Sequence, residues 1–386
     1  MTTAKRITTD AEAVSVARQT AAQISSGSVE RDRDRKLPWN EIELTSQVGL
    51  WAITIPKEYG GAGVSTVTLS EVFAILAEAD ASVAQIPQNH FANVEEIKLV
   101  GNPEQKRFFF ERILQGDRLG NALIDTGGKD VLALQTRLTP VEKGYRLNGH
   151  KSYCTGALFA HWVPVRAVGP DGNLRLAVVA RESEGLEVID DWSSFGQRTT
   201  ASGGVKLTEV FVPEENVFPS YLAYQYRTIR GPFSQIIHVA LDAGIARAAL
   251  TDTLHLLRGG GDVPVSDPFV IAEFGRLRTG LDGAEALMVR AAKAVDQAFA
   301  EPIEPLIVDA AIKVAEAKIA TTEISLLTTN NLFELGGPAT AAESAGLDRH
   351  WRNARVHTLH DPVRWKFHSV GNYYLNDALP PRHAWT

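Results

Sequence analysis

The chain has 386 residues, of which 44% are hydrophobic and 22% charged, so it can bury a large core. Its net charge of −7 offers no basic surface for a phosphate backbone, which argues against nucleic-acid binding. Residues 1–20 lack the apolar stretch of a signal peptide, and no segment has the roughly 18 apolar residues that span a membrane. We therefore expect a soluble, cytoplasmic protein. Cys154 is the only cysteine, so chemistry beyond ordinary side chains requires an organic cofactor.

The hydrophobic periodicity changes twice along the chain. Three-and-four spacing of apolar residues predicts helices up to about residue 116, separated by breakers at Pro38, 60–63, Pro87 and 101–103. From about 119 to 217 the period shortens toward two, which predicts strands. Ala- and Leu-rich segments after about 235 predict the long helices of a bundle. We expect an α+β protein rather than alternating βαβ units, with an all-α domain (1–117), a β-domain (118–232) and a helical bundle (233–386).

Four short motifs follow one another in a set order. They are IPKEYGGAG (55–63), GHKSYCTG (149–156), VFVPEEN (210–216), and LGGP (335–338) with RNAR (352–355). Their order and spacing resemble the acyl-CoA dehydrogenase superfamily over nearly the whole chain. The resemblance implies the fold of that family: an N-terminal helical domain, a middle β-barrel domain and a C-terminal four-helix bundle.

Further strings resemble the flavin-dependent (class D) monooxygenase branch, which includes dibenzothiophene and dimethyl sulfone monooxygenases. They are QNHF (88–91), GNA (120–122), FGQRTTASG (195–203) and WRNARVHTLHDP (351–362). This branch implies a homotetramer that takes FMNH₂ from a separate NAD(P)H-dependent flavin reductase and uses O₂ to oxygenate a small hydrophobic substrate, above all an organosulfur compound. The chain has no nicotinamide fingerprint of its own, because the glycines at 259–261 lead into Asp262-Val-Pro264 and not into an apolar helix.

A carboxylate base distinguishes the two chemistries of the superfamily. Dehydrogenases remove an α-proton with a Glu in one of two places, yet no Glu occurs between Glu215 and Glu273 or after Glu343. The RNAR alignment puts His360 and Asp361 where the dehydrogenases have Tyr-Glu. Asp361 could still be a shortened base, so an FAD-dependent acyl-CoA dehydrogenase remains one alternative, and a non-catalytic flavin-fold binding protein is another.

Oxygen activation requires a polar, uncharged cluster. A flavin C4a-(hydro)peroxide survives only where water is excluded and its oxygens and N5–H are hydrogen-bonded. The candidate catalytic residues are His360, Asn121, Thr155 and His90. The resemblance implies that His360 faces the C4a/N5 edge, with Asn121 and Thr155 nearby and His90 toward the substrate. Relatives have a tyrosine near that histidine and residues 86–100 contain none, so substrate preference is expected to differ from that of the thiophene-type enzymes.

The remaining flavin contacts are expected on the β-domain and at helix ends. Strand alternation would put Tyr153 and Thr155 on one face, and the segment 192–202 is implied to pack over the isoalloxazine. A glycine turn at 336–337 would admit a phosphate, neutralised by an arginine of the same or a neighbouring subunit. The flavin-binding candidates are Tyr153, Thr155, Trp192, Gln197, Arg198, Ser202, Arg258, Gly336, Gly337, His357 and Asp361.

Several candidates have structural alternatives. His357 and His360 can share one helix face before Pro362, which would suit either metal binding or hydrogen bonds to the last helix carbonyls. No third metal ligand follows at a recognisable spacing, so we expect no metal site. His90 could be a helix cap. The remaining structural alternatives are a core position for Trp192, a C-cap for Gly336 and Gly337, and a buried inert thiol for Cys154.

Overall fold

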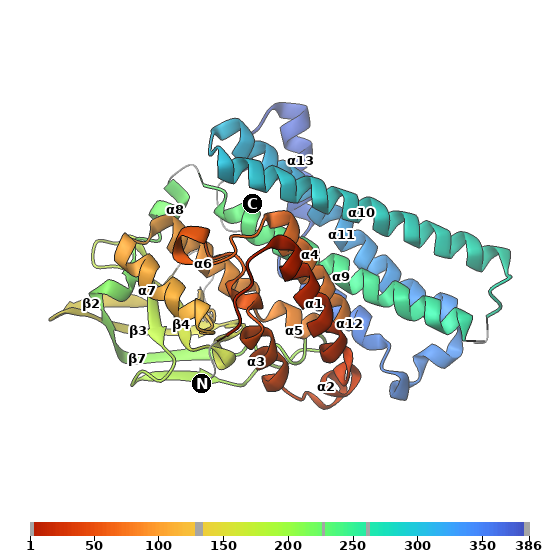
Figure 1. The fold of residues 1–386 in the computed structure, drawn as a ribbon, viewed down its shortest axis with the longest axis horizontal. Helices are drawn as coiled ribbons and strands as arrows, with labels where there is room; N and C mark the ends of the chain where they lie inside the picture. Colours follow the sequence, from red (N-terminus) through yellow and green to blue (C-terminus); the bar gives the residue numbers. More distant parts are fainter. Residues whose placement is uncertain (1–3, 128–133, 226–227, 260–262, 382–386) are drawn as a thin grey trace.

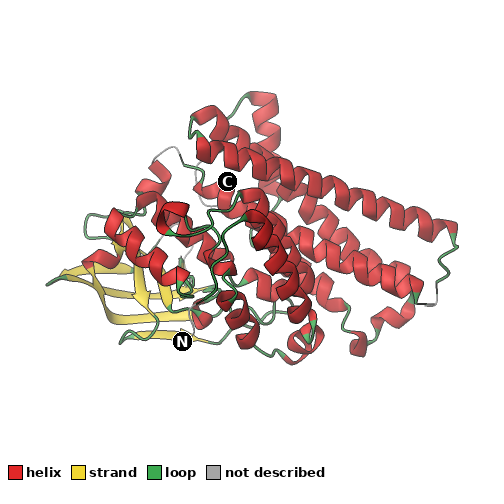
Figure 2. Cartoon of the chain, viewed as in Figure 1, coloured by secondary structure: helices red, strands yellow, loops and turns green. Residues whose placement is uncertain are grey.

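The computed structural model describes residues 4–127, 134–225, 228–259 and 263–381. Figures 1 and 2 show the strands gathered at one end of the molecule and the helices occupying the rest. This segregation confirms the expected α+β class. None of the helices in the described part of the chain combines the length and apolar character needed to cross a bilayer.

The N-terminal part is helical and begins its helices where the sequence predicts. Pro38 and Pro87 immediately precede α3 and α6, and Asn102 caps α7 through a reciprocal capping box with Gln105. Thr9 caps α1 with its hydroxyl. The elements are α1 (Asp10–Ser25), α2 (Ser28–Asp34), α3 (Trp39–Gln47), η1 (Leu50–Ala52), η2 (Lys57–Tyr59), α4 (Thr66–Ala79), α5 (Ala81–Gln85), α6 (Gln88–Val100) and α7 (Pro103–Leu114).

The middle part is one eight-stranded sheet in the order β6-β7-β3-β2-β4-β5-β8, with β1 paired to β3. Its order ends at β6 and β8, so the described sheet is open rather than a closed barrel. Inward residues of β2, β3, β4, β5 and β7 form one core on a single face. The elements are β1 (Ile124–Asp125), β2 (Arg137–Val141), β3 (Gly144–Ser152), η3 (Ala157–Phe159), β4 (Trp162–Val168), β5 (Leu174–Ala180), β6 (Leu186–Ile189), β7 (Gly204–Pro213), η4 (Glu214–Asn216), β8 (Val217–Phe218) and α8 (Leu222–Gln225).

Three long helices dominate the C-terminal part, and the first of them, α9, is buried from Arg230 to Leu250 except at Arg247. It packs against α4 of the N-terminal part as well as against α10 and α11. Because this part of α9 has so little exposed surface, each polar side chain on it needs a partner. The elements are α9 (Arg230–Arg258), α10 (Pro268–Ala300), α11 (Glu304–Gly336), η5 (Pro338–Ala341), η6 (Glu343–Ala345), α12 (Asp348–His357) and α13 (Arg364–Asn376).

The contact between α4 and α9 depends on a glycine. A Cβ atom at Gly244 would collide with the backbone oxygen of Ala74, whereas one at Gly283 on α10 would meet nothing. We expect Gly244→Ala to lower the free energy of unfolding by about 1–3 kcal/mol because helix backbones must separate. Gly283→Ala, the matched control, should raise it by roughly 0.5–1 kcal/mol. Urea denaturation of both variants measures this, and equal effects would contradict the close-packing argument.

Candidate active site

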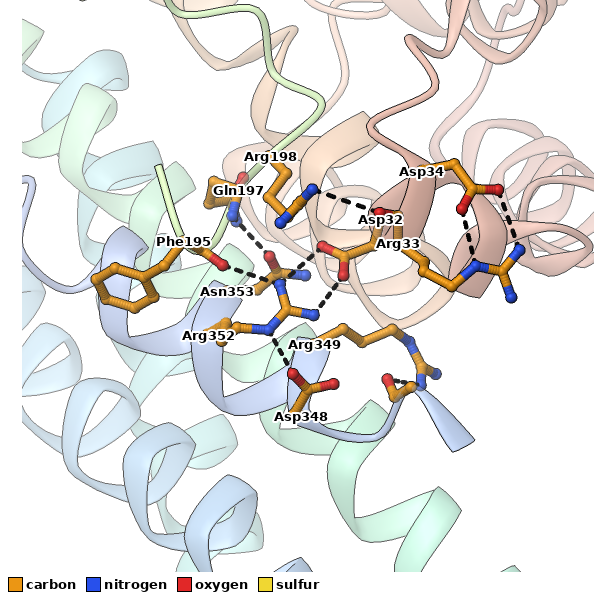
Figure 3. Close-up of polar contacts among 11 residues, drawn as sticks. Asp32, Arg33, Asp34, Phe195, Gln197, Arg198, Asp348, Arg349, Arg352 and Asn353 are labelled. Carbon is orange, nitrogen blue, oxygen red and sulfur yellow. Dashed lines mark hydrogen bonds and ion pairs between the residues drawn. The ribbon is translucent and has the colours of Figure 1, made fainter. Parts of the chain in front are cut away.

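Helix α12 is fixed between the N-terminal helices and the loop that follows β6. The Arg352 guanidinium forms an ion pair with Asp32 on α2. One residue along, Asn353 Oδ1 accepts a hydrogen bond from the backbone N–H of Gln197 (2.7 Å), as Figure 3 shows. The loop and α12 therefore hold each other in one position, one helical turn before His357.

A buried polar chain connects α11, α9 and the end of α12. Asp242 on α9 accepts hydrogen bonds from two residues of α11, Lys318 Nζ (2.5 Å) and Thr322 Oγ1 (3.0 Å). It also accepts one from Nδ1 of His357 (2.5 Å), whose Nε2 atom lies 3.0 Å from Nδ1 of His238. Burial alone would raise the pKa of Asp242, but Lys318 and His357 outweigh burial and lower this pKa to about 2.

His360 extends this chain to a cavity. Its ring stacks on that of His238, with 4.2 Å between the ring centroids and 25° between the planes. The helix ends at His357, earlier than the proline at 362 predicts, and His360 lies in the turn that follows. Desolvation lowers the pKa of His360 to about 4, so the imidazole is neutral at pH 7. A neutral imidazole offers one donor and one acceptor.

The cavity beside His360 has a volume of about 580 Å³ and walls that are mostly apolar. The walls come from β1, α11, α13 and the segment that follows α13. Their apolar members include Ile124, Ala311, Ile312, Ala315, Trp365 and Leu379. Asp361 also lines the cavity, but its carboxylate forms an ion pair with Lys366 (2.9 Å).

A second polar cluster lies at the end of β3, next to the cavity wall at Ile124, which pairs with the last residue of that strand. The Asn121 Nδ2 atom donates to the Tyr153 carbonyl oxygen (3.0 Å). The Trp192 indole N–H donates to the Gln197 carbonyl oxygen (2.8 Å) and packs edge-on against the Tyr153 ring. One catalytic candidate, Asn121, and three flavin-binding candidates, Tyr153, Trp192 and Gln197, are thus brought together here.

Thr155 and Ser202 complete this cluster, although not by the expected strand alternation. Their hydroxyls are 2.6 Å apart and buried. Strand β3 ends at Ser152, and Tyr153 has a left-handed backbone (φ 55°). Consequently Tyr153 is 60% exposed while Thr155 is buried, and the two do not share a strand face. Cys154 between them is buried, which raises the pKa of its thiol and makes it an inert core residue.

The residues of the second cluster fit a flavin, which offers a flat ring with donors and acceptors along its edge. The Gln197 side-chain Nε2 and Oε1 atoms and the Asn121 Oδ1 atom are buried without hydrogen-bond partners. Left-handed backbone occurs at Tyr153 (φ 55°), Gln197 (φ 50°) and Ala201 (φ 46°). Unpaired buried polar atoms and strained backbone together are typical of a ligand site.

Four other candidates lie outside the second cluster. Both ring nitrogens of His90 are engaged by backbone, with Nε2 at the Trp51 oxygen (2.8 Å) and Nδ1 at the Leu119 N–H (3.0 Å). Neither nitrogen of His90 is left for a substrate. Arg258, Gly336 and Gly337 lie at the ends of α9 and α11, which Figure 1 shows on the side of the bundle remote from the sheet.

Gly337, one of these four, and one further candidate, Arg198, have hydrogen-bond partners within the protein. Gly337 caps α11, because its N–H donates to the Phe333 oxygen (3.0 Å). Arg198 reaches the Arg33 carbonyl oxygen on α2 (3.4 Å), as Figure 3 shows. Whether these two residues also contact a flavin stays a prediction from the sequence.

The sequence analysis missed His238, Asp242 and Lys318. His238 and Asp242 are four residues apart in a stretch that is otherwise apolar, from Ile236 to Ala246, and therefore share one face of a buried helix. A polar pair at this spacing inside an apolar helix is a signal that such residues have partners. The partners themselves, 76 and 115 residues away, carry no such signal.

Three models of protein-domain families match this chain in sequence order. They are the acyl-CoA dehydrogenase N-terminal domain at residues 10–117, the middle domain at 125–210 and the C-terminal domain at 236–365. Together they span most of the chain and follow the architecture described above.

Three relatives that match over nearly their full length are flavin-dependent monooxygenases of this superfamily. "Probable FMNH2-dependent monooxygenase SfnC" of Pseudomonas putida is 30% identical over 95% of this chain and 96% of its own length. Dibenzothiophene monooxygenase of Rhodococcus erythropolis is 30% identical over 96% and 95%. The structure of FMN-bound TdsC from Paenibacillus sp. A11-2 superposes with a TM-score of 0.92 at 32% identity, covering 97% of this chain and 100% of that one, and TdsC has also been solved with FMN and indole. The chain therefore belongs to the acyl-CoA dehydrogenase superfamily, among its flavin-dependent monooxygenases.

Proposed function

We propose that this chain is the oxygenase of a two-component system. A separate NAD(P)H-dependent reductase supplies FMNH₂, and the chain uses O₂ to add one oxygen atom to a small apolar molecule, preferentially at sulfur. The overall reaction balances as substrate plus FMNH₂ plus O₂ giving oxygenated substrate, FMN and water. The observation that carries the proposal is a neutral histidine, His360, at the wall of an apolar cavity.

Reduced FMN, when bound, supplies the two electrons that activate O₂. The residues suited to hold it are those of the second cluster, because Gln197 and Asn121 offer unpartnered buried polar atoms and Tyr153 and Trp192 offer aromatic surface. The paired hydroxyls of Thr155 and Ser202 add a donor at the same place. His360 can donate or accept a proton at its ring nitrogens, and the mostly apolar walls offer few polar groups to hold water beside it.

A small apolar substrate is favoured by the cavity walls. Aliphatic side chains of α11 and an indole ring of α13 face the space, and these surfaces suit a compact molecule with few polar groups. Relatives named for dibenzothiophene, and TdsC solved with indole, support this class and its organosulfur members.

The dehydrogenase alternative has less support. Its base would be Asp361, which is buried and held in an ion pair with Lys366. The Lys366 ammonium therefore occupies the carboxylate that would have to take the α-proton. No observation on the described residues favours this function over the oxygenase.

We also propose that the chain works as a homotetramer. Arg258, Gly336 and Gly337 lie far along the bundle, so a neighbouring subunit would bring them to the phosphate of the flavin. Near this end, Phe269 and Ile271 at the start of α10 are 81% and 58% exposed, and apolar side chains so exposed suit burial between subunits.

The decisive measurement is rapid mixing of the chain, loaded anaerobically with FMNH₂, against oxygenated buffer. We expect a transient flavin absorbance band before FMN appears, and an oxygenated product when dibenzothiophene or indole is present. Hydrogen peroxide should be a minor product, because we expect a site with bound flavin and substrate to protect the activated oxygen from water. Immediate FMN formation with full release of peroxide would contradict the proposal, as would bleaching of bound FAD by an acyl-CoA.

Replacement of the neutral imidazole isolates its contribution. We expect His360→Ala to bind FMN and to unfold at the same urea concentration as the wild type, but to form product about 10²-fold more slowly or less. Peroxide should account for the missing oxygen. His255→Ala, an exposed histidine of α9 outside the cavity, is the control and should behave as the wild type. Wild-type yield in His360→Ala would remove this residue from the chemistry.

The cavity wall on α11 sets the substrate size. Ala315 faces the cavity and is otherwise buried, so Ala315→Phe should fill part of the space. We expect kcat/KM to fall about tenfold or more for dibenzothiophene and much less for a small dialkyl sulfide. Ala315→Ser keeps the volume and serves as the control. An equal loss for both substrates would indicate that this wall does not select for size.

A further inference from the structure

Behind His360 lies a set of buried groups that the proposed reaction does not yet use. His238, Asp242, Lys318 and His357 come from three helices and are at most 3% exposed. We propose that Lys318, Asp242 and His357 form a positioning chain that fixes the tautomer of His238 and, through the stacked rings, holds His360 in one orientation at the cavity wall.

The chain begins with a balanced pair of charges. Asp242 is ionised, and Lys318 is its buried counterion at 2.5 Å. With a neutral His357 the cluster carries no net charge, whereas an imidazolium at His357 would leave a net positive charge away from water. A buried, uncompensated charge costs several kcal/mol. Because Lys318 already balances Asp242, we take the His357 ring as uncharged in this proposal.

Neutral His357 has only one ring proton, and Asp242 determines its position. The carboxylate can only accept, so the proton is on Nδ1, which lies 2.5 Å from Asp242. Nε2 of His357 is then an acceptor, and the hydrogen bond at 3.0 Å must be donated by Nδ1 of His238. Burial lowers the pKa of His238 well below its usual value, so His238 is neutral too and its Nε2 carries no proton.

The stacked rings connect the fixed His238 to His360 at the cavity wall. His238 and His360 lie 4.2 Å apart and nearly parallel, while His238 is held by its bond to His357. A fixed ring with a fixed dipole gives the ring above it one preferred orientation. Among the described residues, the titratable and charged groups around His360 are His238 on α9, Lys318 on α11, His357 on α12, the adjacent Asp361, and Lys366 on α13. The two lysines are each paired with a carboxylate, so a neutral His360 faces no net charge.

The tautomers can be read directly by ¹⁵N NMR of histidine-labelled full-length chain at pH 7, with and without FMN. We expect His238 to show a protonated Nδ1 and an unprotonated Nε2. In Lys318→Met the buried negative charge of Asp242 should draw a second proton onto His357, which then donates from Nε2, so His238 should switch to the Nε2–H form. Because a proton replaces the lysine charge, this variant keeps a neutral cluster and should fold at pH 6 to 7.

A matched pair on the same two helices provides the control. His350 on α12 contacts Asp252 on α9 (2.7 Å) but does not belong to the buried set of Lys318, Asp242, His357 and His238. His350→Gln removes a His–Asp pair and should leave the His238 signals unchanged. Should Lys318→Met fail to fold, the double variant Lys318→Met/Asp242→Asn removes both charges together and should release His238 from its single tautomer. A wild-type His238 protonated on Nε2, or a tautomer that is unchanged in these variants, would overturn the inference.

The effect on oxygenation rests on the proposed function and is measured separately. We expect Lys318→Met to lower the ratio of product to peroxide about tenfold, with KM for the substrate and Kd for FMN nearly unchanged. An unchanged ratio of product to peroxide despite a switched His238 tautomer would overturn the idea that these buried residues position His360. A wild-type chain that forms no product contradicts the proposed oxygenase instead, while the tautomer measurement needs no turnover.

Discussion

The carboxylate of Asp242 is the constraint around which the active end of the bundle is arranged. It is fully buried in the part of α9 from Arg230 to Leu250, which has almost no solvent-facing surface. An unpaired charge at that position would be far too costly, so the carboxylate needs donors from neighbouring helices. Lys318 and Thr322 supply them from α11, and His357 supplies one from α12. Satisfying one buried charge thus fixes the relative positions of three helices, and the cavity histidine follows from them.

A second constraint aligns the β-domain with the bundle. The pairing of Gln197 with Asn353 and of Asp32 with Arg352 connects the loop after β6 and helix α2 to the same short helix that carries His357 (Figure 3). Rotation of α12 would therefore disturb the polar cluster at the end of β3 and the histidine chain together. Because one helix contacts both clusters, the residues beyond the end of β3 that suit a flavin and the histidine at the cavity wall keep a constant separation.

The fold was largely predictable from the sequence, and the site only in part. Periodicity and breakers report local structure, which is why α3, α6 and α7 begin at their predicted positions. His360 could be proposed from the sequence because it lies within a contiguous motif. Lys318 was not found, because its role is defined only by a partner 76 residues away. Tyr153 shows a third limit, since its left-handed backbone breaks the alternation on which the shared-face argument rested.

His90 shows how a residue of suitable chemistry can be used for structure instead. It lies fully buried between two backbone groups, and its desolvation lowers its pKa to about 3. His360 also has a lowered pKa, yet it faces a cavity and stacks on a ring rather than binding backbone. Residue type and titration behaviour therefore do not separate the two histidines. What separates them is where the ring nitrogens can reach, and that is determined by the helices that Asp242 holds together.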